Sequence, residues 1–231
     1  MNAPAVRLRS DLGSTLLALA ACAALVAGAG HVHGGMKQRV SRPPSDELLY
    51  YPSGLLVRQA SLGYETAAAD VAWLRGIQYY GEHRLTDQKY ELIGHVMSIV
   101  TDLDPRFLEP YIFGALVLSQ ELKRTDEGLA LLEKGMRANP ESWLLAFEAG
   151  FIHYVCRRDY EAAARYFVRA SRLPGHPEYV DRFAAFATQK AGNTGMAILL
   201  WKRVLLTENE FMREVARREL NRLGVEEGGN L

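Results

Sequence analysis

From about residue 65 onward, apolar positions recur three and four residues apart. This spacing places them on one face of a helix and predicts a series of amphipathic helices. The dipeptides Asp104-Pro105, Asn139-Pro140 and Leu173-Pro174 interrupt the pattern. Proline begins a helix without losing a hydrogen bond, and the residue before it avoids helical geometry. These dipeptides therefore predict the starts of successive helical units, with Asn139 as a helix N-cap.

The chain also repeats itself. Ala163, Phe167 and Ala170 recur thirty-four residues later as Ala197, Trp201 and Val204. One repeat earlier, with a residue of slippage, the corresponding residues are Gly128, Leu132 and Gly135. Small residues let two helices approach closely, and the large residue between them fills the space that remains. A period of this length predicts helical hairpins stacked on one another.

The first helices of the hairpins share a second pattern, in which an aromatic residue is followed by a small one and then by another aromatic. Its members are Trp73, Gly76 and Tyr80, then Tyr111 and Gly114, then Gly150 and Tyr154. With the second-helix pattern, this resembles the tetratricopeptide repeat (TPR) family over residues 65–206. The resemblance implies an all-α fold: a right-handed TPR-type α-solenoid of about four hairpins. Asp181 and Thr188 depart from the family's bulky residues in the fourth hairpin.

Beyond the repeats, residues 207–223 form another amphipathic stretch, with Thr207 and Glu210 in capping-box spacing. We expect a helix that caps the open end of the solenoid. We expect residues 224–231 to form a disordered tail.

The N-terminal part carries an uncharged, apolar run at residues 12–30, after a short tail at residues 1–11. Nineteen helical residues span roughly 28 Å, close to the ~30 Å hydrocarbon core of a bilayer. We therefore expect a single-pass transmembrane helix in the inner (cytoplasmic) membrane. The two arginines of the tail favour a cytoplasmic N-terminus and a periplasmic or otherwise extracytoplasmic soluble domain.

Two alternatives remain for this run. Ala27-Gly28-Ala29 resembles a signal-peptidase site, and cleavage there would release a secreted periplasmic protein. Leu19-Ala20-Ala21-Cys22 resembles a lipobox, after which Cys22 would carry lipid. Residues 31–45 have the composition of a linker. Residues 46–64 are apolar and aromatic, and would either cover the N-terminal end of the solenoid or contact a membrane partner or the bilayer surface.

Composition excludes several functions. Lys plus Arg equals Asp plus Glu, so the basic excess expected of a nucleic-acid-binding protein is missing. The two cysteines, Cys22 and Cys156, form neither a disulfide framework nor a metal motif. We expect Cys156 to be a small buried residue of a helix. No catalytic motif is present. We expect no cofactor, no small-molecule substrate and no enzyme activity.

The TPR resemblance implies a ligand groove lined by the first helix of each hairpin. Projected onto this sequence, the groove would contain Leu74, Gln78, Ile112, Leu116, Gln120, Glu148, Ile152, Cys156, Arg182, Phe186 and Lys190. Ile112 and Leu116 occupy places where chaperone-binding TPR domains clamp a carboxylate with Lys and Asn, so that clamp is missing. An apolar groove of this kind would suit a peptide with apolar anchors. Alternatively, Ile112, Leu116 and Ile152 only pack against neighbouring helices.

These features predict a membrane-anchored scaffold or adaptor for an envelope-associated assembly, bound to one or more protein partners. The alternative is an obligate structural subunit of a membrane complex, in which residues 46–64 and the anchor are buried against partner chains.

Overall fold

The computed structural model describes residues 20–24, 27–28 and 54–225. The chain falls into two units, residues 1–47 and 48–231. In the first unit, the described residues are helical and exposed. None of the helices described is at once long enough and apolar enough to span a membrane. The predicted anchor at residues 12–30 lies largely outside the described residues, and the linker at residues 31–45 lies wholly outside them.

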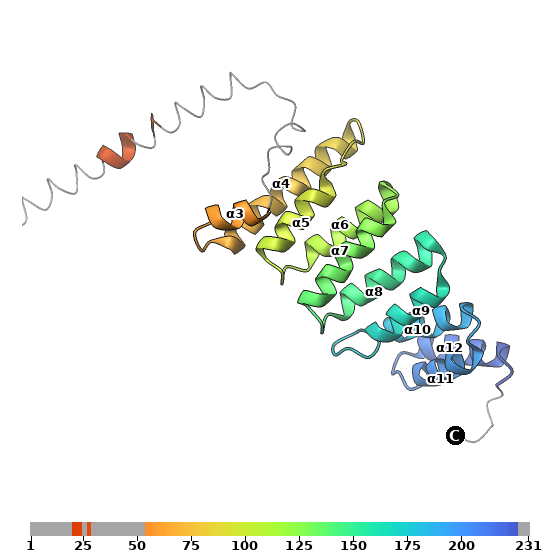
Figure 1. The fold of residues 1–231 in the computed structure, drawn as a ribbon. Helices are drawn as coiled ribbons and strands as arrows, with labels where there is room; N and C mark the ends of the chain where they lie inside the picture. Colours follow the sequence, from red (N-terminus) through yellow and green to blue (C-terminus); the bar gives the residue numbers. More distant parts are fainter. Residues whose placement is uncertain (1–19, 25–26, 29–53, 226–231) are drawn as a thin grey trace, which may run out of the picture. The chain divides into compact units, whose positions relative to one another are not determined.

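The described part of the second unit consists of helices joined by turns, with no strand among its described residues, which confirms the all-α prediction (Figure 1). Its elements are α3 (Gly54–Ala60), α4 (Glu65–Leu85), α5 (Ile93–Leu103), α6 (Glu109–Leu116), η1 (Val117–Glu121), α7 (Thr125–Ala138), α8 (Trp143–Ile152), η2 (His153–Arg157), α9 (Tyr160–Ala170), α10 (Tyr179–Lys190), α11 (Thr194–Val204) and α12 (Glu210–Arg222).

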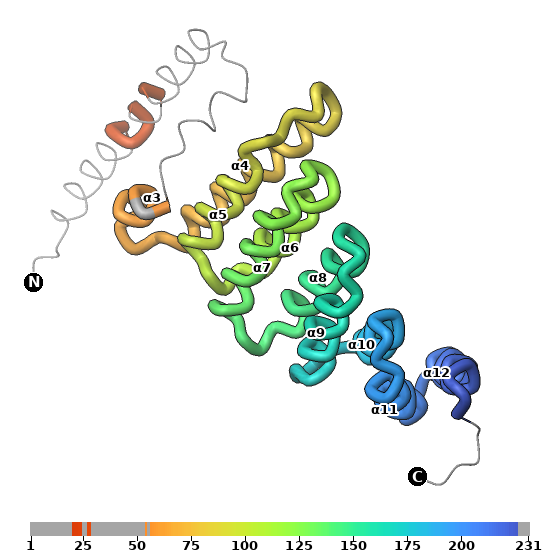
Figure 2. Tube along the Cα trace, turned by 45° about the vertical axis from the view of Figure 1, so that its right-hand side comes forward, coloured from red at the N-terminus to blue at the C-terminus, as the bar shows by residue number. Residues whose placement is uncertain are grey.

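Each helix of this unit packs mainly on its neighbours in sequence (Figure 2). The hairpins pair α4 with α5, α6 with α7, α8 with α9, and α10 with α11. Each hairpin then packs on the next, and α12 packs on α11 and α10. The core is therefore built from local contacts between consecutive helices.

The turns inside the four hairpins share two backbone features. A residue with positive φ lies in each of them, at Gln88, Lys123, Arg158 and Gly192, spaced by 35, 35 and 34 residues. A backbone N–H just at or beyond that residue donates to a carbonyl five or six positions back, as C-terminal capping of a helix requires. The accepting residues are His83, Leu118, His153 and Thr188, spaced by 35 residues. They fix the register between hairpins.

The slippage of one residue between repeats comes from π-helical turns. The first helices of the second and third hairpins end in π-helical segments, η1 and η2. Such a segment adds one residue to the helix. The interval from Gly128 to Ala163 spans η2 and is 35 residues, whereas Ala163 to Ala197 spans only the α-helical end of α10 and is 34.

The residues predicted to pack between repeats lie where close packing requires them. Fully or nearly fully buried are Gly76, Tyr111, Gly114, Gly128, Leu132, Gly150, Ala163, Phe167, Ala170, Ala197 and Trp201, and half-buried are Trp73, Tyr80 and Tyr154. The first hairpin supplies the equivalent buried residues Ile93, Met97 and Val100, which the sequence comparison missed. They could have been recognised from the sequence, because each lies 35 residues before its counterpart, Gly128, Leu132 or Gly135.

Glycine is needed where helices nearly touch. A Cβ atom on Gly128 would lie 2.8 Å from the backbone oxygen of Ala115, and one on Gly150 would lie 2.8 Å from the ring of Phe167. Gly81 of α4 has the opposite environment, with no atom within 4 Å of such a Cβ.

Two predicted helix caps are wrong. Asn139 ends α7 and donates from its side chain to the carbonyls of Pro105 and Gly135, while Ser142 caps α8. Asn209, rather than Thr207, caps α12, with its Oδ1 accepting from the N–H of Met212 at 3.3 Å. In both places the chain makes an extra turn before the helix begins, which a spacing rule cannot detect.

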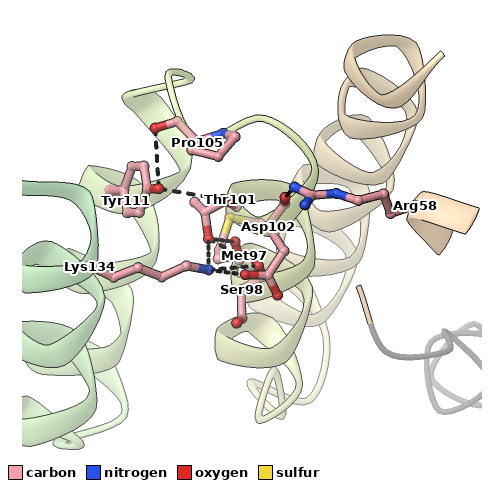
Figure 3. Close-up of polar contacts among 8 residues, drawn as sticks. All are labelled: Arg58, Met97, Ser98, Thr101, Asp102, Pro105, Tyr111 and Lys134. Atoms are coloured by element: carbon pink, nitrogen blue, oxygen red, sulfur yellow. Dashed lines mark hydrogen bonds and ion pairs between the residues drawn. The ribbon is translucent and has the colours of Figure 1, made fainter. Parts of the chain in front are cut away.

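The described part of the pre-repeat segment forms α3, which is tied to the C-terminal end of α5 (Figure 3). Arg58 of α3 donates to the carbonyl of Asp102. Lys134 of α7 donates to the Ser98 carbonyl, to Thr101 Oγ1 and to Asp102 Oδ1, at 3.1, 2.7 and 2.6 Å. Cations here satisfy the last carbonyls of α5 and oppose its dipole.

Substitution of Gly128 tests the close approach of helices. Gly128→Ala should lower the free energy of unfolding by about 1–3 kcal/mol, because the new methyl group collides with backbone. Gly81→Ala should instead raise it by about 0.5–1 kcal/mol, because alanine is the better helix former. Chemical denaturation followed by circular dichroism measures both. Equal effects of the two substitutions would contradict the packing described.

Candidate functional site

The first helices of the hairpins carry the predicted groove residues, and the structure places these in three environments. Leu74, Gln78, Gln120, Phe186 and Lys190 are exposed, Ile112, Leu116, Glu148 and Arg182 are half-buried, and Ile152 is buried. Ile152 is 0% exposed and belongs to the core, as the packing alternative expected. It cannot contact a partner in this conformation.

The register of the hairpins explains this difference. The turn carbonyls of Leu118, His153 and Thr188 are equivalent and lie 35 residues apart, so corresponding positions of these hairpins also differ by 35 residues. Ile112, Leu116 and Gln120 of the second hairpin therefore correspond to Phe147, Phe151 and Val155 of the third. The residues predicted for the third hairpin were Glu148, Ile152 and Cys156, and each lies one position after the residue that this register gives. Phe151 is half-buried, and Val155 is 49% exposed. In the fourth hairpin the same register gives Arg182, Phe186 and Lys190, which are the residues that the sequence predicted.

Aromatic rings hold neighbouring first helices together. Trp73 and Tyr80 of α4 both pack edge-on against Phe113 of α6, with ring centroids 5.6 and 5.1 Å apart. Phe147 of α8 packs in the same way on Phe183 of α10, at 5.2 Å. Phe113 and Phe183 were not predicted from the sequence. The available signal was their distance from Phe147, because Phe113 lies 34 residues before it and Phe183 lies 36 residues after it.

A pocket of about 250 Å³ lies at the C-terminal end of this face, between η2, α10 and α12. It is lined by Tyr154, Arg182, Phe183, Phe186 and Val215. Small-molecule sites usually measure about 300–1,000 Å³. The pocket is smaller than that and mainly apolar, so it suits one large apolar side chain of a partner.

Two cations lie on the same stripe of α10 as Phe186, four residues on either side. Arg182 lies over the ring of Phe183, with its guanidinium carbon 5.7 Å from the ring centroid. Lys190 lies over Tyr160, with Nζ at 5.2 Å. Neither forms an ion pair with another described residue. Aromatic faces attract cations without neutralising them, so both charges remain available to acidic groups.

Glu148 lies beside this face, half-buried and without a hydrogen bond to any described residue. Burial raises the pKa of its carboxyl group above the usual range. A donor or cation from a partner would compensate this desolvated carboxylate.

Cys156 differs from its prediction. It is exposed, because it lies in η2 at the end of the first helix, where no neighbouring helix covers it. Partial burial still raises the pKa of its thiol, so the group is not activated as a thiolate. Cys22 is also exposed.

Glu121 of η1 anchors the turn of the first hairpin. It accepts hydrogen bonds from the hydroxyls of Tyr80 and Tyr90 and pairs with Arg84 at 2.9 Å. The bond to Glu121 raises the pKa of Tyr90 to about 12. Tyr80, Tyr90 and Arg84 belong to the first hairpin and Glu121 to the second, so these hydrogen bonds and the ion pair join the two hairpins.

His153 occupies a second, polar pocket of about 450 Å³ between α7 and α9. Its ring stacks on Tyr166 at 5.3 Å, and Nδ1 lies 3.8 Å from Asp159 Oδ2. Burial lowers the pKa of His153 and Arg165 adds to this, while Asp159 and Glu133 oppose it. Among the described residues, no group of three His, Cys, Asp or Glu side chains could hold a metal ion.

Comparisons with known proteins do not identify the chain: no family model matches the sequence, and no curated protein matches it.

The buried imidazole makes stability depend on pH. Because the pKa of His153 is lower in the folded state, the unfolded chain binds the proton more readily below about pH 6.5. The free energy of unfolding should therefore fall as pH drops from about 7.5 to about 5.5. His153→Gln should reduce this dependence. Denaturation curves of both proteins across that range measure it, and an unchanged slope in the variant would contradict the assignment.

Proposed function

We propose that the chain is a membrane-anchored, TPR-type scaffold that binds protein partners along the face of its first helices. The observation that carries the proposal is the apolar row that the 35-residue register aligns on this face. It consists of Ile112 and Leu116, then Phe151 and Val155, then Phe186. Repeat proteins use such continuous faces for binding, because each hairpin adds an equivalent position.

A right-handed solenoid fits hairpins that pack only on their neighbours and repeat every 34 or 35 residues. In such an arrangement the first helices line the inner surface, and the apolar row becomes a groove for a peptide with apolar anchors. The carboxylate clamp of chaperone-binding TPR domains remains missing, because Ile112 and Leu116 take its place. The envelope-associated assembly proposed as the client rests on the proposed anchor and on analogy with other anchored TPR proteins.

Substitution on the row tests the proposal. Val155→Glu places a charge at an exposed apolar position of the row, and should abolish capture of the partner by crosslinking and affinity purification from native membranes. Leu199→Glu is the matched control, because Leu199 is also exposed but belongs to a second helix, α11. Capture that survives Val155→Glu, or is lost equally in both variants, would contradict binding on this face.

The second candidate function is an obligate subunit of a membrane complex. A specific observation favours it: Leu56, Leu62, Tyr64, Val71 and Leu74 leave large apolar side chains exposed around α3 and α4. Expression of residues 46–231 alone separates the two functions. A monodisperse product supports the scaffold, whereas aggregation supports a subunit whose α3–α4 surface is permanently covered.

The proposed inner-membrane location, with the soluble domain outside the cytoplasm, depends on an uncleaved anchor at residues 12–30. Mass spectrometry of the mature protein should give the mass of the uncleaved N-terminus. A chain that starts near His31 would show signal cleavage, and a lipid adduct on Cys22 would show a lipoprotein. Either result would replace the single-pass anchor.

A further inference from the structure

The pocket between η2, α10 and α12 has an exposed aromatic residue beside it that no part of the described chain covers. Phe211 of α12 is 63% exposed. It precedes Val215, which lines the pocket, by four residues, so both lie on one side of the helix. α12 packs on α11 and α10 (Figure 2). Its buried residues, Met212, Ala216, Glu219 and Leu220, fix this orientation.

α12 is held firmly in this position. Trp201 Nε1 of α11 donates to Gln189 Oε1 of α10 at 2.7 Å, and Gln189 Nε2 donates to Glu219 Oε2 of α12 at 3.1 Å. Arg222 pairs with the other oxygen of Glu219 at 2.7 Å. Because these bonds connect α10, α11 and α12, they hold Phe211 in place beside the part of the pocket that α10 and α12 form.

We propose that a second copy of this chain docks here, with Phe211 of each copy entering the pocket of the other. A surface that carries both an apolar pocket and an aromatic side chain next to it can pair with itself around a two-fold axis. This is the isologous arrangement of most homodimers. The size of the pocket matches the occupant, because it suits a single large side chain.

Charge complementarity favours the same occupant. The wall of the pocket carries Arg182, which has no ion-pair partner in the described part of the chain. Glu208 and Glu214 lie on either side of Phe211 in sequence and are exposed. Glu208 forms no ion pair with a described residue, and Glu214 lies 3.8 Å from Arg217. In the dimer, acidic groups beside Phe211 approach the arginine of the other copy.

A standard interface buries roughly 1,200–2,000 Å², and a contact built on one aromatic side chain and one small pocket in each copy should be weaker, so we expect the dimer to depend on concentration. Sedimentation of the full-length chain in detergent should show a mass that rises from monomer to dimer. Phe211→Ala should weaken the association at least about tenfold, because a buried aromatic anchor is lost. The control is Leu199→Ala on α11, at a residue that is also 63% exposed but lies away from the pocket.

A crosslinking experiment tests the geometry. Cys22 and Cys156 are replaced by Ser, and two differently tagged copies carry Phe211→Cys and Phe186→Cys. A short bis-maleimide should join the two tags, while Leu199→Cys in place of Phe211→Cys should not react. Circular dichroism melting checks that the variants remain folded.

Three outcomes would overturn the proposal: a monomer at every concentration, a dimer equally stable in Phe211→Ala and Leu199→Ala, or tags that crosslink no more than in the Leu199→Cys control. These experiments use the purified protein alone, without any other partner. Failure here therefore leaves the scaffold function untouched, and loss of partner capture by Val155→Glu leaves the dimer untouched.

Discussion

The close contact between helices at small residues is the constraint on which the rest of this structure depends. Gly128 allows α7 to lie against the backbone of Ala115, and Gly150 allows α8 to lie against the ring of Phe167. Ala163 and Ala197 occupy the equivalent place in later hairpins and are completely buried. Interiors are packed as densely as organic crystals, so a larger residue at these points would separate the hairpins and expose the core between them.

This packing also determines what reaches the surface. Every helix of the hairpins buries one side and leaves another open, and on the first helices the less buried side carries Leu116, Phe151 and Phe186. The aromatic contacts from Trp73 and Tyr80 to Phe113, and from Phe147 to Phe183, keep the first helices in register. An apolar row on rigid helices is suited to binding, because little conformational entropy is lost when a partner docks.

Polar interactions have a different role in this fold. Lys134 and Arg58 satisfy the carbonyls that end α5, Glu121 secures the first turn, and Gln189 and Glu219 fix α12. These clusters close the ends of helices or join neighbouring hairpins. Arg182 and Lys190 are not part of these clusters: they lie over the rings of Phe183 and Tyr160 and form no ion pair with a described residue.

The sequence by itself determined the helical class, the period and the residues that pack between repeats, because these follow from spacing along one chain. Of the residues projected onto the first-helix face, Ile112, Leu116 and Arg182 are half-buried and Phe186 is exposed. Ile152 and Cys156 fall one residue past the positions that correspond to Leu116 and Gln120, because the projection spaced these two hairpins by 36 residues, whereas their hydrogen-bonded turns are spaced by 35. Only the tertiary structure decided that Phe151 and Val155 belong to the face. Only the tertiary structure formed the pocket, because it joins Tyr154, Phe186 and Val215 from three separate helices.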